Sequence, residues 1–487
     1  MRLHPLDILI IVVYLLGITF FGLRFRKSQR SLRDYFLADR NIPWWAIALS
    51  IVAAETSTLT VIGTPGIAYG GNFGFLQVVF GYLAGRVVIT LIFIPQYFRG
   101  EMFTAYQLID RRFGTVLHRI TAGVFLLTRA AAEGVRVWAV AIVVAIALGT
   151  SEIGSVAIVM LLTLIYTFEG GMAAVIWTDV VQLIIYVSGT LVGLFTLMHL
   201  VPGGWPAVHA AAAAAHKLQV FDFGFSLFKT YTFWAGLIGG MFLTTATHGT
   251  DQLLVQRLLA ARNKRDSQTA LLFSGIVVLA QFTLFLLVGA GLWVFYRMFP
   301  PATIFSKTDY IFPTFIVEHM PHGISGLLIA AILAAAMSNL SAALNSLSST
   351  TMIDFYLRFR PQTSERTRLA LSRSATIVWG IVLFTLALAS RYGGSVLERG
   401  LSIASVAYGG LLGVFLLGLL TKRATQTGAI VGMICGLALN VYIWEWTHVA
   451  WTWYVTIGSS TTFIVGYVAS LATAPQPRQE ETRASTG

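Results

Sequence analysis

The sequence predicts an all-α integral membrane protein with about thirteen membrane-spanning helices. Of the 487 residues, 56% are hydrophobic and only 11% are charged, whereas soluble domains carry about 25% charged residues. Apolar runs of roughly 20 residues recur along the chain, and each can cross the hydrocarbon core of a bilayer as a helix. The ~10-residue alternating segments of a membrane β-barrel do not occur. The lipid bilayer is therefore the expected surrounding of this chain.

The apolar runs predict thirteen spans in a fixed arrangement. They cover 6–24, 44–70, 74–97, 118–148, 154–168, 173–200, 230–249, 268–298, 325–347, 373–390, 400–420, 427–446 and 450–472. After the first span, ten spans divide into five within 44–200 and five within 230–420. Because each set holds an odd number, the second set starts from the opposite side, as in the inverted repeats of secondary transporters. The remaining segments are 1–43, an extra span with a basic loop; 201–229, an outer loop; 421–473, two further spans; and 474–487, a disordered tail.

The basic residues lie between the apolar runs. The net charge is +12, and Lys and Arg gather in 24–40, 98–117, 250–267, 348–372 and 421–424. This pattern is typical of cytoplasmic loops and argues against a nucleic-acid partner. It predicts an N-terminus outside and a C-terminus in the cytoplasm of a cell membrane. Run 6–23 is followed by arginines and not by a cleavage site, so it is expected to be a retained span. The single cysteine, Cys435, excludes an intrachain disulfide.

Two spans are too polar to face lipid. Span 44–70 contains Glu55, Thr56 and Ser57, and the helix-breaking residues 63–66 (Gly-Thr-Pro-Gly) lie near its outer end. Unwound backbone there could turn carbonyl groups toward a cation. Span 325–347 carries Ser338 and Asn339, whose oxygens suit a small cation. Tight helix packing and hydrogen bonds back to the same helix are the alternative interpretations.

Asp179 is an acid inside a predicted span. It follows the turn at 170–171 by eight or nine residues, which places it roughly 10 Å up the helix. An acid at that depth is a functional hypothesis by default, and a first-turn cap would lie closer to the turn. Counting residues in the same way puts Asp179, Ser338 and residues 53–56 at one depth, slightly to the cytoplasmic side of the bilayer midplane. Helix packing alone does not predict this coincidence.

Charged residues also occur in span 118–148. Arg129 and Glu133 are spaced i, i+4, and Glu133 and Arg136 i, i+3, so they can pair on one helix face or orient a substrate. Asp251 ends the seventh span. No phosphate-binding loop, zinc spacing or nucleophile–base pair occurs, and an enzyme is therefore not expected.

Five segments occur on these spans in a characteristic order. They are Asp34–Arg40, Gly170–Asp179, Gly249–Gln252 with Val255–Arg257, Leu344–Ser346 and Tyr408–Phe415. In these segments the chain resembles the sodium:solute symporter family, which includes carriers of sugars, proline, sialic acid, monocarboxylates and vitamins. The resemblance covers nearly the whole chain and implies a ten-helix inverted-repeat core with added helices.

The resemblance implies a sodium site between spans 44–70 and 325–347. By motif position, the ligands would be the backbone carbonyls of Ala53, Thr56 and Ala335, the hydroxyl of Ser338 and the side chain of Asn339. The family usually has Ser or Thr where Asn339 stands, and an amide oxygen can also bind a hard cation. Asp179 matches a family acid near a second cation position, which Ser341 would face, for a second sodium or a proton.

The solute is expected on the outer side of the sodium site. The candidate residues are Glu55, Ser57, Thr60, Gln77, Arg136 and Asp251. Glu55 would suit the hydroxyl groups of a sugar, whereas a monocarboxylate would need a cation such as Arg136 to offset Glu55. The expected function is sodium-coupled symport of a small organic solute, sugar or monocarboxylate-like, by alternating access. A proton-coupled or uncoupled carrier is the alternative.

Overall fold

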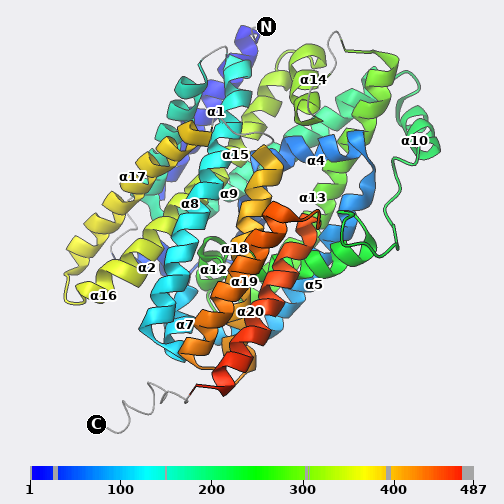
Figure 1. Cartoon of the computed structure of the whole chain (residues 1–487). Coiled ribbons are helices and arrows are strands. Elements are labelled where there is room, and N and C mark those ends of the chain that lie inside the picture. Colours follow the sequence, from blue (N-terminus) through cyan, green and yellow to red (C-terminus); the bar gives the residue numbers. More distant parts are fainter. Residues whose placement is uncertain are drawn as a thin grey trace.

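The computed structural model describes residues 3–25, 31–148, 151–301, 305, 308–390 and 396–473. Across these ranges every named element is a helix, and the only β contact is an isolated bridge between Ile42 and Ala261. The all-α class predicted from the sequence is therefore confirmed. Figure 1 shows the helices arranged as one long bundle.

Eight helical segments among the described residues are long and apolar enough to cross a membrane. They are α1 (Pro5–Leu23), η3–α6 (Phe73–Tyr97, containing α5, Leu76–Ile92), the second part of α9 (Gly171–Leu200), α13 (Lys264–Met298), α15–α16 (Ile324–Phe359, containing α15, Ile324–Thr350), α17 (Glu365–Ala389), α19 (Gln426–Trp446) and η8–α20 (Trp451–Leu471). The bent pair α3 (Trp44–Glu55) and α4 (Thr58–Gly70) makes a ninth segment if it is one span. These segments confirm a multi-pass helical protein.

The remaining helices connect or accompany these segments. They are α2 (Leu32–Leu37), η2 (Ala38–Arg40), α7 (Tyr106–Phe113), α8 (Thr115–Leu148), α9 (Glu152–Leu200), α10 (Gly204–Ala214), η4 (Ala235–Gly239), α11 (Gly240–Gly249), α12 (Gln252–Leu259), η5 (Thr308–Tyr310), α14 (Ile311–His319) and α18 (Val396–Leu420). Helix α9 turns at Gly171, where φ is +55°. This is the turn predicted at 170–171, and glycine adopts such a backbone at little steric cost.

Span 44–70 is broken, but not where the sequence analysis expects the break. The helix continues through residues 63–66, with Pro65 inside α4, so that expectation is wrong. The break lies at Thr56 and Ser57, and the two halves are bent by 64°. Ser57 starts α4 because its hydroxyl accepts from the backbone N–H of Thr60 and the Thr60 side chain returns the bond. This capping box stabilises a new helix start within the span.

A second break separates α11 from α12. Asp251 caps α12, and its carboxylate accepts from the backbone N–H of Leu253 at 2.8 Å. Residues 250–267 are predicted to form a basic loop, and this prediction is wrong for Gln252–Leu259, since all eight residues of this helix are buried. Its leucines pack into the core, so burial of apolar surface outweighs the loop-like charge pattern.

Two tethers fix the ends of the bundle. Asp7 of α1 is buried, and its Oδ1 accepts from the backbone N–H of Gly323 (2.6 Å) and Gly326 (2.9 Å) at the start of α15. It therefore satisfies donors that a helix N-terminus leaves free.

Beyond the opposite end of α15, Asp110 of α7 is ion-paired with Arg358 of α16 (Leu357–Phe359), and the ring of His118 lies 3.7 Å from the same carboxylate. Burial would raise the pKa of Asp110, but the neighbouring His118 and Arg358 side chains prevail and lower it to about 2. The Asp110 side chain thus stays charged and holds α7 against the end of the long helix.

Helix α5 approaches η4 and the start of α11 closely through glycine. A Cβ atom built on Gly81 would lie 2.3 Å from the carbonyl oxygen of Gly236, and one on Gly240 would lie 2.5 Å from that of Val78. Small residues at such contacts are characteristic of helix packing within membranes, where backbones can approach only if side chains are absent. This contact fixes the position of α11 and of the break that follows it.

Candidate functional site

A cavity of about 430 Å³ lies where the two broken helices meet α8 and α18. It extends from the break between α3 and α4 to Tyr231, Thr308 and Trp451. Five of the six predicted solute residues line it: Glu55, Ser57, Thr60, Arg136 and Asp251. The cavity therefore collects predicted residues that are separated by as much as 196 positions in the sequence, from Glu55 to Asp251.

Gln77, the sixth predicted solute residue, does not line this cavity. Its amide nitrogen donates to the carbonyl of Gly74 at 3.1 Å, and its amide oxygen accepts from the backbone N–H of Asp222 at 2.9 Å. Gln77 thus fastens the loop 218–231 to the start of α5.

Glu55 belongs to a buried ion pair at the cavity wall. Arg86 of α5 donates to its carboxylate, and His248 of α11 lies 3.4 Å from the same oxygen. Arg86 also donates to the hydroxyl of Ser274 at 3.1 Å and is 1% exposed, whereas Glu55 is 14% exposed. The guanidinium stabilises the Glu55 charge in this low-dielectric setting, while one edge of the carboxylate faces the cavity.

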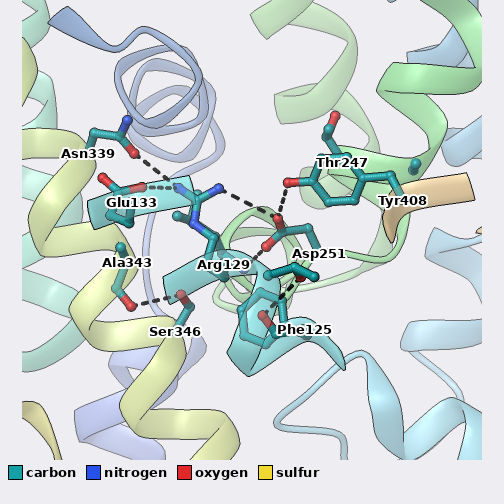
Figure 2. A network of polar contacts seen from close by, with 12 residues as sticks. Phe125, Arg129, Glu133, Thr247, Asp251, Asn339, Ala343, Ser346 and Tyr408 are labelled. Atoms are coloured by element: carbon teal, nitrogen blue, oxygen red, sulfur yellow. Dashed lines mark hydrogen bonds and ion pairs between the residues drawn. The ribbon is translucent and has the colours of Figure 1, made fainter. Parts of the chain in front are cut away.

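A second network surrounds Arg129 (Figure 2). Its Nη2 donates to Glu133 at 3.0 Å and to the Asn339 amide oxygen at 3.2 Å, and its Nη1 lies 3.7 Å from Asp251. Asp251 in turn accepts from the hydroxyl of Tyr408 at 2.6 Å. The network joins α8, α15, α18 and the α11–α12 break around one guanidinium. The spacing-based prediction that Arg129 and Glu133 pair is confirmed.

Asp179 is the centre of a third cluster. Its Oδ1 accepts from the hydroxyl of Ser338 at 2.7 Å, and its Oδ2 accepts from Ser50 at 2.5 Å and from Arg257 at 2.8 Å. Arg257 also donates to Ser50 at 2.8 Å. Asp179 is fully buried and Arg257 is 1% exposed, so each charge is compensated by the other. The cluster links α9 to α3, α12 and α15.

The predicted sodium ligands lie on α15, on α3, which packs against it, and in the break that follows α3. Ala53 stands in the last turn of α3, whose final carbonyl groups lack helical donors because the helix ends at Glu55. Thr56 lies in the break itself, and its hydroxyl accepts from Gln281 at 2.7 Å. Ala335 and Ser338 are buried in α15, spaced i, i+3 on one face.

Two predicted cation residues have other partners. Asn339 offers its amide oxygen to Arg129. Ser341 donates to the carbonyl of Ser338 at 2.9 Å, which is the bond back to the same helix that the sequence analysis gave as its alternative.

Arg86, Arg257 and Tyr408 take part in these networks but were not predicted as site residues. Arg86 is an isolated cation inside span 74–97, and the cost of an intramembrane charge could have identified it. Arg257 is one of several basic residues in 250–267, so its pairing could not be distinguished there. Tyr408 lies within a motif but carries no separate signal.

The comparison with family models identifies the chain. A model of the sodium:solute symporter family matches residues 35–436. The chain belongs to the sodium:solute symporter family. As a symporter it is a transporter and not an enzyme, and sodium is the coupling ion of the family.

Several sodium-coupled transporters are similar to this symporter. Sodium-coupled monocarboxylate transporter 2 of Bos taurus is 28% identical over 433 residues, covering 87% of this chain and 69% of that protein. The human sodium/iodide cotransporter is 28% identical over 430 residues, which cover 86% of this chain and 66% of that protein. The chain thus spans about two thirds of the length of these two proteins. The sodium/sialic acid symporter SiaT of Proteus mirabilis is 27% identical over 484 residues, covering 98% and 97%.

Solved structures show the same architecture. The substrate-bound, outward-open state of a Na⁺-coupled sialic acid symporter superposes with a TM-score of 0.90 at 27% identity, covering 98% of this chain and 99% of that one. The nucleobase-cation-symport-1 transporter Mhp1, closed with bromovinylhydantoin bound, gives a TM-score of 0.60 at 13% identity, covering 93% and 98%. The second likeness concerns the fold alone.

Proposed function

We propose that this symporter couples sodium to the movement of a small organic anion that carries one carboxylate, either a monocarboxylate or an acidic sugar. The observation that carries the proposal is Arg136 at the cavity wall. Its contact with Glu133 is long, 3.5 Å, while Arg129 holds the same Glu133 oxygen at 3.0 Å. Arg136 keeps 23% exposure, so its guanidinium can receive a carboxylate in a bidentate manner.

The chemistry of the relatives supports an anionic solute. The named solutes of the similar transporters are a monocarboxylate, iodide and sialic acid, and each is an anion. The cavity also offers Ser57 and Thr60 at the helix break, whose hydroxyls could bind the oxygen atoms of a carboxylate or of a sugar. Glu55 would accept from solute hydroxyl groups, and Asp251 would orient Arg129 through the network described above.

We place the sodium ion between α3 and α15. Its ligands would be the carbonyls of Ala53, Thr56 and Ala335 with the Ser338 hydroxyl and the Asn339 amide oxygen. The free carbonyls at the end of α3 support this position. A second cation, sodium or proton, would bind at Asp179 with Ser341 nearby. This second site requires Arg257 to move, since the guanidinium holds Asp179 at 2.8 Å.

The proposed architecture has thirteen spans with a 5+5 inverted core. Beyond the nine segments above, we assign crossings to α8, the first part of α9, α11 with α12, and α18; α8 alone has 34 residues. The repeats would be 44–200 and 230–420, flanked by 1–43 and 421–473, with loop 201–229 outside; the tail 474–487 lies outside the described residues. The N-terminus would lie outside and the C-terminus in the cytoplasm of the cell membrane, following the basic loops.

Transport would proceed by alternating access. Sodium would bridge the break in span 44–70 to α15 and so favour the state in which the solute site is formed. Coupling is then the difference in affinity of each ligand for the two states of the carrier. The membrane potential would add about 2.3 kcal/mol per charge per 100 mV.

The test is uptake of labelled solutes into proteoliposomes, with sodium or potassium as the only cation. Lactate, N-acetylneuraminate and an uncharged sugar form the panel. We expect uptake of an anion that requires sodium and is reduced at least tenfold in Arg136→Gln, since bonds to a charged group are worth ~1.5–3 kcal/mol. The control is Arg119→Gln, an exposed arginine near the N-terminal end of the same helix.

Three results would contradict the proposal. Uptake of the uncharged sugar alone would exclude a carboxylate solute. Equal uptake by the Arg136 and Arg119 variants would remove Arg136 from the site. Uptake driven by a pH gradient and indifferent to sodium would favour the proton-coupled alternative.

A further inference from the structure

Arg129 touches both the solute cavity and the helix that carries the candidate sodium ligands (Figure 2). Its side chain lines the cavity, yet its Nη2 donates to the amide oxygen of Asn339 at 3.2 Å. Asn339 follows Ser338 directly on α15 and is 2% exposed. A single guanidinium therefore lies between the place where a solute would bind and a side chain expected to hold sodium.

The amide of Asn339 is fixed in one orientation by Arg129. Turning the amide over would place its NH₂ group against the guanidinium, and two donors would face each other. The amide nitrogen, Nδ2, is buried and has no hydrogen-bond partner. A buried donor without a partner is costly. In this arrangement Arg129 gains an acceptor, while the amide nitrogen of Asn339 is left without one.

The same oxygen cannot serve Arg129 and sodium equally well. A sodium ion bound to Asn339 Oδ1 would lie close to the guanidinium, and the two positive charges would repel each other inside the protein. Arg129 has alternative anionic partners in Glu133 at 3.0 Å and Asp251 at 3.7 Å. It can thus turn away from Asn339 and stay paired, particularly if another anion enters the cavity.

We propose that Arg129 and sodium compete for the amide oxygen of Asn339, and that the carboxylate of the solute settles the competition by drawing Arg129 toward the cavity. The inference rests on the proposed function, from which it takes the sodium position and the anionic solute. Arg129 is then a positioning residue that makes sodium bind weakly to the empty carrier and more tightly to the solute-loaded one. By linkage, sodium raises the affinity for the solute by the same factor.

The experiment measures the sodium dissociation constant of the purified full-length protein by tryptophan fluorescence. Sodium chloride replaces choline chloride at constant ionic strength, without solute and then with lactate or N-acetylneuraminate. In the wild type we expect the solute to tighten sodium binding about tenfold or more, the scale of one hydrogen bond to a charged group. In Asn339→Ser we expect sodium to bind about tenfold more tightly without solute, and the solute to add little.

Two further variants separate this mechanism from a structural role. Arg129→Lys keeps the charge but cannot hold three partners in a planar fork, so it should reduce the coupling factor as Asn339→Ser does. Asn345→Ser is the matched control, because Asn345 is an equally buried asparagine of α15 whose oxygen accepts from Gln256 at 3.1 Å. It should keep the wild-type coupling factor.

The outcomes distinguish the two proposals. If sodium binds the wild type and Asn339→Ser equally, or binds the variant more weakly, competition by Arg129 is excluded while the sodium site stands. If sodium binds neither protein, with or without either solute, the sodium position itself is wrong and the proposed function loses its basis.

Discussion

The Asp179–Arg257 pair gives a quantitative test of the buried network. Replacing Asp179 by Asn removes the charge that faces Arg257 at 2.8 Å. With an effective dielectric constant of about 20, that attraction amounts to ~6 kcal/mol. Because both groups are already buried, removal of one leaves the other uncompensated, for which ~3–5 kcal/mol of destabilisation is typical. We expect this loss in Asp179→Asn and a similar one in Arg257→Gln.

The double variant decides whether the pair acts as a unit. The double variant Asp179→Asn, Arg257→Gln removes both charges. Its free energy of unfolding should therefore resemble that of the more stable single variant. The free energy of unfolding would be measured by SDS titration in mixed micelles. The exposed pair Asp222–Lys229 is the control, and its loss should cost at most about 1 kcal/mol. Effects of the two buried variants that add within ~0.5 kcal/mol would refute the reasoning.

Three further predictions follow from contacts described above. Glu55→Gln should abolish most sodium-dependent uptake and destabilise the protein by ~3 kcal/mol or more, since it leaves a buried arginine unpaired; equal uptake by variant and wild type would contradict this. Gly81→Ala should cost ~1–3 kcal/mol through overpacking, whereas Gly17→Ala, where a Cβ meets nothing within 4 Å, should be nearly neutral in the same SDS titration. Asp110 has a pKa lowered to about 2 from an ordinary 3.8, so its contribution to the free energy of unfolding is present above pH 4 and lost as the pH falls toward 2. Asp110→Asn should therefore reduce the loss of stability between pH 4 and 2. An unchanged loss in this range would show that other groups cause it.

Local geometry explains what could be predicted from the sequence. The pairing of Glu133 with Arg129 and Arg136 follows from spacings of three and four residues on one helix. That Ser338 and Asp179 lie at one depth follows from counting residues along two spans, whereas the side chain expected to face Asp179 is that of Ser341 and the hydrogen bond is made by Ser338. Both arguments need only the rise per residue and the helical repeat.

Contacts between helices set the limit of prediction. The composition of residues 63–66 predicts a helix break, yet α4 continues through them. The break lies earlier, because Ser57 caps a new helix. Arg257 reads as one charge among several, yet its partner Asp179 lies 78 positions away. Which guanidinium faces which carboxylate depends on the rotation of each helix about its axis, and a single sequence carries no measure of that angle.

The three ion networks have a consequence for voltage. Together the three networks contain the acids Glu55, Glu133, Asp179 and Asp251 and the bases Arg86, Arg129, Arg136 and Arg257, so four acids match four bases when His248 is neutral. Along these residues the empty carrier bears no net charge, and its return step should be insensitive to membrane potential. If the solute is the monoanion proposed above, the current recorded during transport counts the sodium ions carried in excess of the solute. One sodium ion per monoanion predicts electroneutral transport. Two sodium ions per monoanion predict that one positive charge moves inward per cycle.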